Sequence, residues 1–482
     1  MEKIFEKKEL IKKSKDFSSW YTDVILKAKL ADYAPVKGCM VIRPYGYALW
    51  ENIQNNLDRM IKKAGIKNAY FPLFIPHSFL RREKEHVKGF SPELAVVTHG
   101  GGKKLTEPLV VRPTSETIMY AMFKKWISSW RDLPLLINQW CNIVRWERRT
   151  FLFLRTMEFL WQEGHTCHRL HNEAKEEVKR ALKMYEAFYR EFLALPGFAG
   201  KKSETERFPG ALDTFTYEML MPDGKALQGC TSHDLGQNFS EVFEISFQDK
   251  DGKKKYVWQT CWGLSTRSIG ALIMVHGDDQ GLVLPPKIAP IQTVIIPIFE
   301  KKTTQEILAF CSKIKEDLEK GGIRVELDNR TQYTPGWKFN EWELKGVPLR
   351  VEIGKKEIKE NFVRVVRRDT NTDSRFEIQD LRFKIQRLLD EIQENLYKKA
   401  ERSLEENTHE VGDNYEEFKK AMKGKRGFLW AFWCGNPKCE AKIKEETKAT
   451  TRLLPLDAKK QKGKCIYCGK KAEHLWLFAQ AY

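Results

Sequence analysis

Two groups of residues in this chain of 482 have the types and the spacing that a chemical site requires. The first group lies in two β-rich segments, 138–148 and 156–166. Side chains two apart in a strand share a face, so the first segment should present four together: Cys141, Ile143, Arg145 and Glu147. The second should present two aromatic and two polar side chains: Phe159, Trp161, Glu163 and His165. Such convergence is typical of a small-molecule site, although a salt bridge beside a half-buried aromatic cluster would share the pattern.

The second group consists of four cysteines near the end of the chain: Cys434, Cys439, Cys465 and Cys468. Two close pairs, separated by the 25 residues 440–464, match the two knuckles of a tetrahedral zinc site, and four thiolates would make that site closed and structural. Two disulfides, or thiols without metal, are the alternatives. The other six of the ten cysteines occur singly, as expected of reduced thiols in a cytoplasmic protein.

The charge balance favours an anionic partner. Lysine and arginine number 83 and aspartate and glutamate 65, which gives a net charge of +18. A protein that binds nucleic acid is expected to carry such an excess, but a basic, well-solvated enzyme would share it. No apolar run approaches the ~18–20 residues of a membrane helix. Residues 1–16 alternate basic and acidic side chains, so we expect neither a signal peptide nor a membrane anchor there.

Periodicity predicts the elements that position the first group. Residues 46–64 and 172–195 place apolar side chains at three- and four-residue steps, which indicates two amphipathic helices. Short segments rich in β-branched and aromatic residues predict further strands: 69–76, 215–221, 226–230, 243–247 and 256–262. Mostly antiparallel strands with helices around them indicate an α+β domain, which we expect to span residues 1–284.

A proline-rich junction at 284–287 should end this first domain. Beyond it strands (293–298, 323–328, 348–353, 362–366) alternate with helices (304–320, 376–399), which predicts an α/β second domain over 285–402. Residues 403–482 should form a small α+β third domain that carries the cysteines. Its last eight residues, 475–482, stay apolar, so we expect a buried strand and a docked Tyr482.

The first group resembles a known family. The runs RWE (145–147) and RTMEFLWQEGHT (155–166) resemble motif 2 of class II aminoacyl-tRNA synthetases, specifically of prolyl-tRNA synthetases of the archaeal and eukaryotic type. Residues 46–76 resemble motif 1, the dimer element. Other runs resemble, in family order, the amino-acid loop (RPTSET, 112–117), the pocket loop (QGCTSHDLGQNFS, 228–240), motif 3 (WGLSTR, 262–267) and the anticodon-binding domain (PGWKFNEWELKGVPLRVE, 335–352).

This resemblance implies a class II catalytic fold followed by an anticodon-binding domain, in a cytoplasmic homodimer. It implies that the chain joins L-proline to ATP, with magnesium, as prolyl-adenylate and transfers proline to the 3′ end of tRNA-Pro. Arginine is suited to bringing two anions together, because it is always charged and binds in bidentate fashion. Positioning and electrostatic stabilisation then carry the step without a nucleophile or general base. Zinc rests on the cysteine spacing alone, because some family members lack these cysteines.

By resemblance, the catalytic residues are Arg145, between the α-phosphate and the proline carboxylate, and Arg267, against the ATP. The other residues expected at the nucleotide are Glu147, Arg155, Thr156, Gln228 and Thr231. Those expected at proline, besides Arg145, are Thr114, Glu116, Phe159, Trp161, Glu163, His165, His233 and Ser265. An alternative places Thr156, Glu163 and His165 behind the residues that touch the ligands. Candidates for the two guanines that end a proline anticodon are Lys338, Arg350 and Glu352, although each could be structural.

Two departures from the family pattern have consequences. The loop 148–153 carries Phe151 and Leu152 where the family usually has basic residues and prolines, which leaves its contact with the tRNA acceptor end an open question. Only 62 residues separate Thr166 of motif 2 from Gly229 of the pocket loop, too few for the editing domain of bacterial-type prolyl enzymes. A proline pocket rejects alanine by only ~1–3 kcal/mol per missing methylene, so a separate protein should clear mischarged alanine.

Other functions stay open at this point. A synthetase-like protein could bind tRNA without charging it, but such relatives usually lose the nucleotide arginines, whereas this chain keeps Arg145, Glu147 and Arg267. A synthetase for another small amino acid is disfavoured by the segments 114–116 and 161–165. For Tyr482 the resemblance implies a terminal carboxylate that reaches toward the active site; the alternative is a strand that completes the third domain without touching the site.

Overall fold

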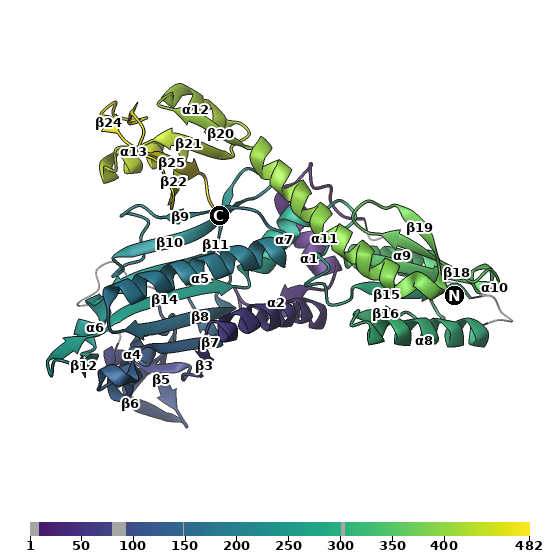
Figure 1. Ribbon diagram of the computed structural model, residues 1–482, viewed down its shortest axis with the longest axis horizontal. Coiled ribbons are helices and arrows are strands. Elements are labelled where there is room, and N and C mark those ends of the chain that lie inside the picture. Colours follow the sequence, from purple (N-terminus) through teal and green to yellow (C-terminus); the bar gives the residue numbers. More distant parts are fainter. Residues whose placement is uncertain (1–8, 80–92, 148, 300–303) are drawn as a thin grey trace.

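A computed structural model describes residues 9–79, 93–147, 149–299 and 304–482. Its largest feature is an eleven-stranded sheet in the order β20-β21-β25-β22-β9-β10-β11-β14-β8-β7-β3, which runs through the left part of Figure 1. A separate five-stranded sheet lies at the other end of the molecule (Figure 1). The long sheet continues from the first domain into the third, a connection that the sequence did not predict.

Six antiparallel strands form the centre of the long sheet: β9 (Phe198–Lys201), β10 (Asp213–Leu220), β11 (Ala226–Gly236), β14 (Trp258–Ser265), β8 (Glu158–His168) and β7 (Leu135–Val144). Helix α5 (His171–Glu191) lies along them (Figure 1). Its 3.6-residue period puts Ala181, Tyr185 and Phe188 on one face, where all three are buried in the main core. This helix covers one face of the sheet and leaves the other face for a site.

The remainder of the first domain surrounds these strands. Helices α1 (Phe17–Lys27), α2 (Pro44–Lys63) and α7 (Arg267–His276) complete the main core, to which Trp20, Trp50 and Ile273 contribute. The smaller elements are β1 (Ala31–Tyr33), β2 (Met40–Ile42), β3 (Lys67–Asn68), β4 (Phe74–Pro76), β5 (Val96–Gly100), β6 (Lys103–Val111), α4 (Glu116–Trp126), η1 (Trp130–Asp132), α6 (Asn238–Val242), β12 (Ser246–Gln248) and β13 (Lys254–Tyr256).

The second domain is built on the sheet β16-β15-β17-β18-β19, in which β15 runs parallel to β16 and β17. Its elements are β15 (Thr293–Pro297), α8 (Thr304–Lys320), β16 (Val325–Leu327), α9 (Pro335–Leu344), β17 (Leu349–Ile353), α10 (Lys355–Lys359), β18 (Phe362–Arg367), β19 (Asp373–Glu377), η2 (Ile378–Asp380) and α11 (Leu381–Glu406). The predicted linker is packed into the structure: Pro285 and Pro286 are buried, and Arg324 Nη2 donates to the Pro286 carbonyl (2.7 Å).

The third domain extends the sheet of the first domain at its edge. It comprises β20 (Thr408–Gly412), α12 (Tyr415–Lys423), β21 (Phe428–Phe432), α13 (Pro437–Thr447), β22 (Thr450–Pro455), β23 (Gly463–Lys464), β24 (Lys471–Ala472) and β25 (Leu475–Ala479). The predicted terminal strand is confirmed, since Leu477 and Phe478 of β25 are fully buried. Strand β22 pairs with β9 through Leu454↔Lys201 and Pro455↔Gly200, which joins the two domains by backbone hydrogen bonds.

The predicted fold classes are confirmed, but several boundaries move. The first strand of the site ends at Val144, its last residue paired with β8, so Arg145 and Glu147 lie beyond it; Arg148 lies outside the described residues. Strand β11 extends to Gly236 because it pairs with both β10 and β14. The predicted strand 256–262 is split between β13 and β14, and the long helix begins only at Leu381. Over the residues described, no helix combines the length and apolar character that a membrane crossing needs.

Candidate active site

Strand β8 brings its four predicted side chains onto one face. Phe159, Trp161, Glu163 and His165 line a cavity of about 400 Å³, which we call the first cavity. Between them, Gln162 points the other way and accepts a hydrogen bond from the Tyr185 hydroxyl of α5 (2.5 Å). The same cavity is lined by eight more of the predicted residues: Thr114, Glu116, Arg145, Gln228, Thr231, His233, Ser265 and Arg267. The period of two therefore correctly predicted that these four side chains of β8 share one face.

Glu163 is the centre of a buried hydrogen-bond network beside the first cavity. Its Oε1 accepts from Gln139 Nε2 (3.0 Å) and from the Ser115 hydroxyl, and its Oε2 lies 3.1 Å from His165 Nε2. The other ring nitrogen of His165 lies 3.2 Å from the Tyr120 hydroxyl. Because Glu163 and His165 are only 2% and 1% exposed, this network is shielded from water and holds both side chains in one orientation.

The two histidines of the first cavity have opposite tendencies to protonate. Burial acts to lower the pKa of His165, but the hydrogen bond and the charge of Glu163 outweigh it and raise that pKa. Burial, with the positive charge of Lys202, lowers the pKa of His233 to about 3, so this imidazole is neutral. Its Nδ1 lies 2.9 Å from the Thr214 hydroxyl, which fixes the ring at the cavity wall.

Glu116 adds a second buried carboxylate. It accepts a hydrogen bond from the Thr114 hydroxyl, and its carboxylate, His165 and Cys261 offer ligand atoms within 4.8 Å of one another. Metal binding there would compete with existing bonds, because both nitrogens of His165 are engaged and burial raises the pKa of the Cys261 thiol. Two carboxylates in a sheltered cavity suit a small organic cation such as a protonated amine.

Arg145 and Arg267 stand where two cavities meet, since both also line a second cavity of about 460 Å³. Arg145 Nε donates to the Pro113 carbonyl (3.1 Å), and Arg267 Nε donates to the Leu154 carbonyl (3.2 Å). Burial lowers the pKa of both guanidinium groups, and the charge of Arg145 lowers that of Arg267 further. Two cations this close repel each other, so an anion placed between them would be strongly stabilised.

The second cavity contains only part of the predicted nucleotide set. Glu147, Arg155 and Thr156 line it, and Arg155 Nε donates to Glu147 Oε2 (2.8 Å). Gln228 and Thr231, also predicted at the nucleotide, line the first cavity instead. The two cavities share four residues: Arg145, Phe159, Ser265 and Arg267. A ligand in the second cavity that extends past these four residues into the first cavity could contact Gln228 and Thr231.

Apolar residues anchor the loop between β7 and β8. The Phe151 ring stacks on Tyr21 of α1, with ring centres 5.0 Å apart, and the Tyr21 hydroxyl donates to the Leu152 carbonyl (2.8 Å). Leu152 and Phe153 are buried in the main core. The unusual Phe151 and Leu152 therefore fasten the loop to α1, while Arg149 stays exposed.

Sequence reasoning missed one wall of the first cavity. The segment 202–212, between β9 and β10, contributes Lys202, Glu206, Arg207, Phe208 and Pro209. The Phe208 ring lies 4.7 Å from the ring of His233. This segment has no periodicity of its own, and its place depends on the partners of β9 in the sheet. Only the interleaving of basic, acidic and aromatic residues at 206–208 could have drawn attention to it.

The three residues predicted at the anticodon occupy different settings in the second domain. Lys338 is 1% exposed, and its Nζ donates to the Asp328 carbonyl (2.9 Å), which suits a role inside the domain. Arg350 is less buried and donates from Nε to Glu352 Oε1 (2.9 Å). Arg350 also lines a small hollow with four polar residues that were not predicted: Glu343, Arg367, Arg368 and Asn371.

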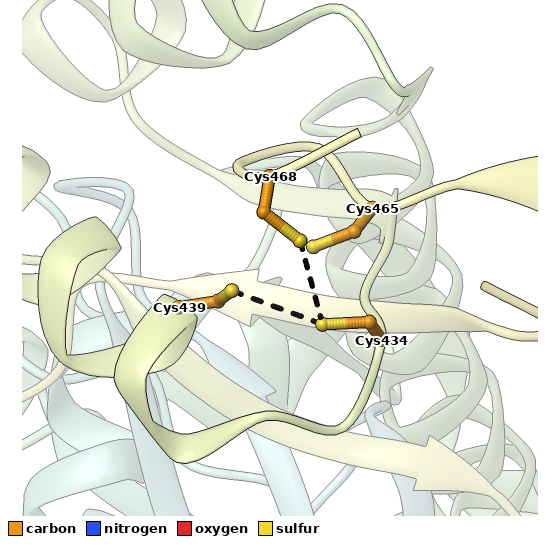
Figure 2. Close-up of side chains that lie close together, drawn as sticks. All are labelled: Cys434, Cys439, Cys465 and Cys468. Atoms are coloured by element: carbon orange, nitrogen blue, oxygen red, sulfur yellow. Dashed lines mark hydrogen bonds between the residues drawn. The ribbon is translucent and has the colours of Figure 1, made fainter. Parts of the chain in front are cut away.

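The four cysteines converge from the end of β21, from α13 and from the turn after β23, as Figure 2 shows. Their sulfur atoms all lie within 4.8 Å, and Cys434 Sγ is 3.8 Å from the sulfurs of Cys439 and Cys468. A disulfide requires about 2.05 Å, and all ten cysteines are free. Four sulfurs placed about 2.3 Å from a central zinc would be about 3.8 Å apart, so this spacing fits a tetrahedral zinc site.

Tyr482 reaches the second cavity. It lines that cavity, and its N–H donates to the Ala226 carbonyl (3.2 Å). Lys225 Nζ lies 4.6 Å from the centre of its ring. The last residue is therefore next to the site, as expected, while the strand before it packs in the third domain.

Three family models match the chain in order. The tRNA synthetase class II core domain (G, H, P, S and T) matches residues 101–276, the anticodon binding domain matches 292–388, and the C-terminal domain of prolyl-tRNA synthetase matches 415–482. Each match falls inside one of the three predicted domains.

Curated relatives match over nearly the full length. A proline–tRNA ligase of Natranaerobius thermophilus is 54% identical over 462 residues, which cover 96% of this chain and 95% of the relative. Proline–tRNA ligase 2 of Clostridioides difficile is 53% identical and covers 98% of each chain. The crystal structure of a prolyl-tRNA synthetase from Cryptosporidium parvum, in complex with halofuginone and AMPPNP, superposes with a TM-score of 0.94 at 45% identity, covering 98% of this chain and 100% of that one.

Proposed function

The chain belongs to the prolyl-tRNA synthetase family, class II ligases that attach proline to tRNA, and we propose that its two cavities hold proline and ATP on either side of Arg145. The observation that carries this assignment is the position of Arg145 and Arg267 at the shared wall of the two cavities. Attack of the proline carboxylate on the α-phosphate joins two anions, so the reacting atoms should meet where two cations already stand.

The first cavity is proposed to hold proline. The proline imino group is cationic, and the buried Glu116 and Glu163 supply negative charge on its side of the site. Trp161 and Phe159 would bound the ring, with Thr114, His165, His233 and Ser265 completing the pocket. Arg145 would receive the carboxylate, because its guanidinium lies 5.9 Å from the Trp161 ring and therefore at the same end of the pocket.

The second cavity is proposed to hold ATP, and the relative that was solved with AMPPNP supports a nucleotide site in this fold. Glu147 would accept from the adenine amino group, with Arg155 and Thr156 lining the nucleotide. Gln228 and Thr231 would contact the part of the nucleotide nearest proline, because they line the first cavity. Magnesium would arrive with ATP as part of the substrate.

The decisive experiment is proline-dependent exchange of pyrophosphate into ATP. We expect exchange with proline and weaker but measurable exchange with alanine or cysteine, because each missing methylene weakens binding by ~1–3 kcal/mol. Exchange that alanine supports as well as proline would reassign the first cavity. A protein that binds tRNA-Pro without any exchange would overturn the proposed roles of Arg145 and Arg267.

For tRNA recognition we propose that the second domain reads the anticodon, with Arg350 as the main candidate and Glu352 as its orienting partner. Lys338 would act through Asp328, because its ammonium group is buried. Arg350→Glu should lower the rate of tRNA-Pro charging and leave pyrophosphate exchange unchanged. Equal loss of both reactions would show that Arg350 is structural.

For the third domain we propose one structural zinc held by Cys434, Cys439, Cys465 and Cys468. The spacing of the four sulfurs supports the site; the backbone N–H of Lys470 lowers the pKa of Cys468 to about 7, whereas burial raises the pKa of Cys434 and of Cys439. Elemental analysis of fresh protein should find about one zinc per chain, and metal-free protein would refute the site.

Three further properties complete the proposal. We propose the domain boundaries 1–284, 285–402 and 403–482; limited proteolysis should spare both junctions, because Pro285 and Pro286 are buried and α11 runs through residues 402–403. We propose a cytoplasmic homodimer of the archaeal and eukaryotic type, as motif 1 and the absence of an editing insertion between residues 167 and 228 support. Sedimentation at micromolar concentration would test the dimer.

A further inference from the structure

Helix α13 carries an acidic residue with an unusual set of partners. Glu440 follows Cys439 directly, is 4% exposed, and belongs to the third domain. Its carboxylate accepts hydrogen bonds from the hydroxyls of Ser203 (3.1 Å), Thr205 and Thr451. A buried carboxylate is costly unless its oxygens are satisfied, and here three neutral hydroxyls satisfy it. Two of these hydroxyls belong to the first domain, more than 230 residues earlier in the chain.

Those two residues begin the segment that closes the first cavity. Ser203 Oγ also accepts from the backbone N–H of Glu206 (3.3 Å), which starts the run of cavity-lining residues 206–209. Phe208 continues the run: its N–H donates to Thr214 Oγ1 (2.9 Å), the hydroxyl that also bonds His233. Two runs of hydrogen bonds, Glu440–Ser203–Glu206 and Phe208–Thr214–His233, are therefore joined by the backbone of residues 206–208.

The third domain contacts the segment 202–212 at a second point, through Glu218. Arg452 of β22 donates from Nη2 (2.8 Å) and Nε (3.1 Å) to Glu218 Oε2. The other oxygen of Glu218 lies 3.5 Å from Lys202 Nζ, and Lys202 lines the first cavity. All three charged groups are at most 6% exposed. This ion cluster fixes the position of Lys202, at the start of the segment. Glu440 fixes the next turn through Ser203 and Thr205.

We propose that Glu440 is a positioning residue for amino-acid binding: it holds segment 203–208 against the first cavity, so that the pocket is complete only when the third domain is folded around its cysteines. The inference rests on the proposed placement of proline in the first cavity. It assigns to the third domain a role in the activation step that its distance in sequence from the catalytic motifs does not suggest. Glu440 touches no substrate and acts through Ser203 and Thr205.

The test compares Michaelis constants in pyrophosphate exchange. Glu440→Ala should raise the KM for proline about tenfold, because small displacements of pocket residues are costly, and leave the KM for ATP within about twofold. Glu440→Gln should restore most of the affinity, because serine and threonine hydroxyls both donate and accept. Glu445→Gln is the matched control: it lies on the same helix but is exposed and pairs with Lys442.

A second variant distinguishes the proposed effect from misfolding of the third domain. Thr205→Val removes one hydroxyl from the first-domain side and leaves the Glu440–Thr451 bond intact, and it should reproduce the rise in the KM for proline. The proposal is overturned if Glu440→Ala and Thr205→Val both keep that KM within twofold of wild type. It is also overturned if the KM values for proline and ATP rise together with a loss of zinc or a lower melting temperature. Absence of proline-dependent exchange in the wild type would instead refute the proposed function.

Discussion

The two cavities of the active site are built on different physical principles. In the first, Glu116, Glu163 and His165 are at most 3% exposed and are bonded to groups of the protein itself. In the second, the side chains of Glu147 and Arg155 are 25% and 60% exposed, and their ion pair is open to solvent. The first cavity is therefore a preformed network, whereas the second presents charges that a ligand can rearrange.

This difference matches the size of the two substrates. The proposed proline site would gain selectivity from a fixed, buried set of groups shaped for a ring, one cation and one carboxylate. The proposed ATP site would bind a large and highly charged ligand through exposed charges together with Arg145 and Arg267. The following experiments test whether the two cavities behave separately.

The largest effect is expected from Arg145→Ala, because this residue belongs to both cavities. Removing one electrostatic stabiliser should lower the turnover of adenylate formation by about 10²–10³. Steady-state pyrophosphate exchange measures it, with Arg131→Ala as the control, since Arg131 is exposed and stacks on Trp130 away from the site. A rate within tenfold of wild type would contradict the assignment of Arg145.

A pair of matched variants should separate the cavities. Glu163→Gln replaces a carboxylate that accepts from Ser115 and Gln139 with a neutral amide. Because a charged hydrogen-bond acceptor is lost, the KM for proline should rise about 10–100-fold, and the KM for ATP should change little. Glu147→Gln should raise the KM for ATP only a few-fold, because exposed ion pairs contribute little, and should spare proline. Identical changes in both constants for either variant would show that the two sites are one unit.

The two histidines should give stability changes of opposite sign with pH. His233 has a pKa of about 3 in the folded protein, below the ~6.5 of unfolded histidine. Its contribution to the free energy of unfolding is therefore complete above pH 6.5 and is lost as the pH falls from 6.5 toward 3. By pH 5 the loss should be about 2 kcal/mol. His165 has a raised pKa, so its contribution is complete below pH 6.5 and is lost as pH rises through the folded value.

Chemical unfolding at pH 5, 7 and 9 would measure this contrast. His233→Asn should reduce the loss of stability on acidification, and His165→Asn should reduce the loss on the alkaline side. The wild type also contains His168 and His276, whose pKa values are lowered to about 4 by burial, so only the difference between wild type and variant isolates His233. Equal acid sensitivity of the wild type and His233→Asn would contradict the neutral state of His233.

A small effect, comparable to that of Glu147→Gln, is expected from deletion of Tyr482. It lines the second cavity but is 42% exposed, so its loss should raise the KM for ATP about threefold to tenfold through one lost contact. The melting temperature should not change, because the buried strand β25 ends at Ala479. Unchanged kinetics would mean that the terminal residue only covers the edge of the third domain.

Much of the first cavity could be predicted because local patterns encode it. The period of two in 158–168 set Phe159, Trp161, Glu163 and His165 on one face whatever surrounds the strand. Beyond Val144 the strand ends, yet the backbone N–H of Arg145 still donates to the Met157 carbonyl (2.8 Å) and Arg145 lines the first cavity as the rule predicted, whereas Glu147 lines only the second cavity. The assignment of Gln228 and Thr231 came from family likeness, and their cavity could be known only once β11 was placed beside β14.

The sequence by itself determined which side chains share a face, where four cysteines could meet, and that the chain ends in a buried strand. Only the tertiary structure decided that β22 pairs with β9, that Glu440 reaches Ser203, and that segment 202–212 forms a wall of the first cavity. The physical reason is distance along the chain: periodicity and motif spacing act within a few tens of residues, whereas packing between segments hundreds of residues apart selects which strand pairs with the edge of a sheet.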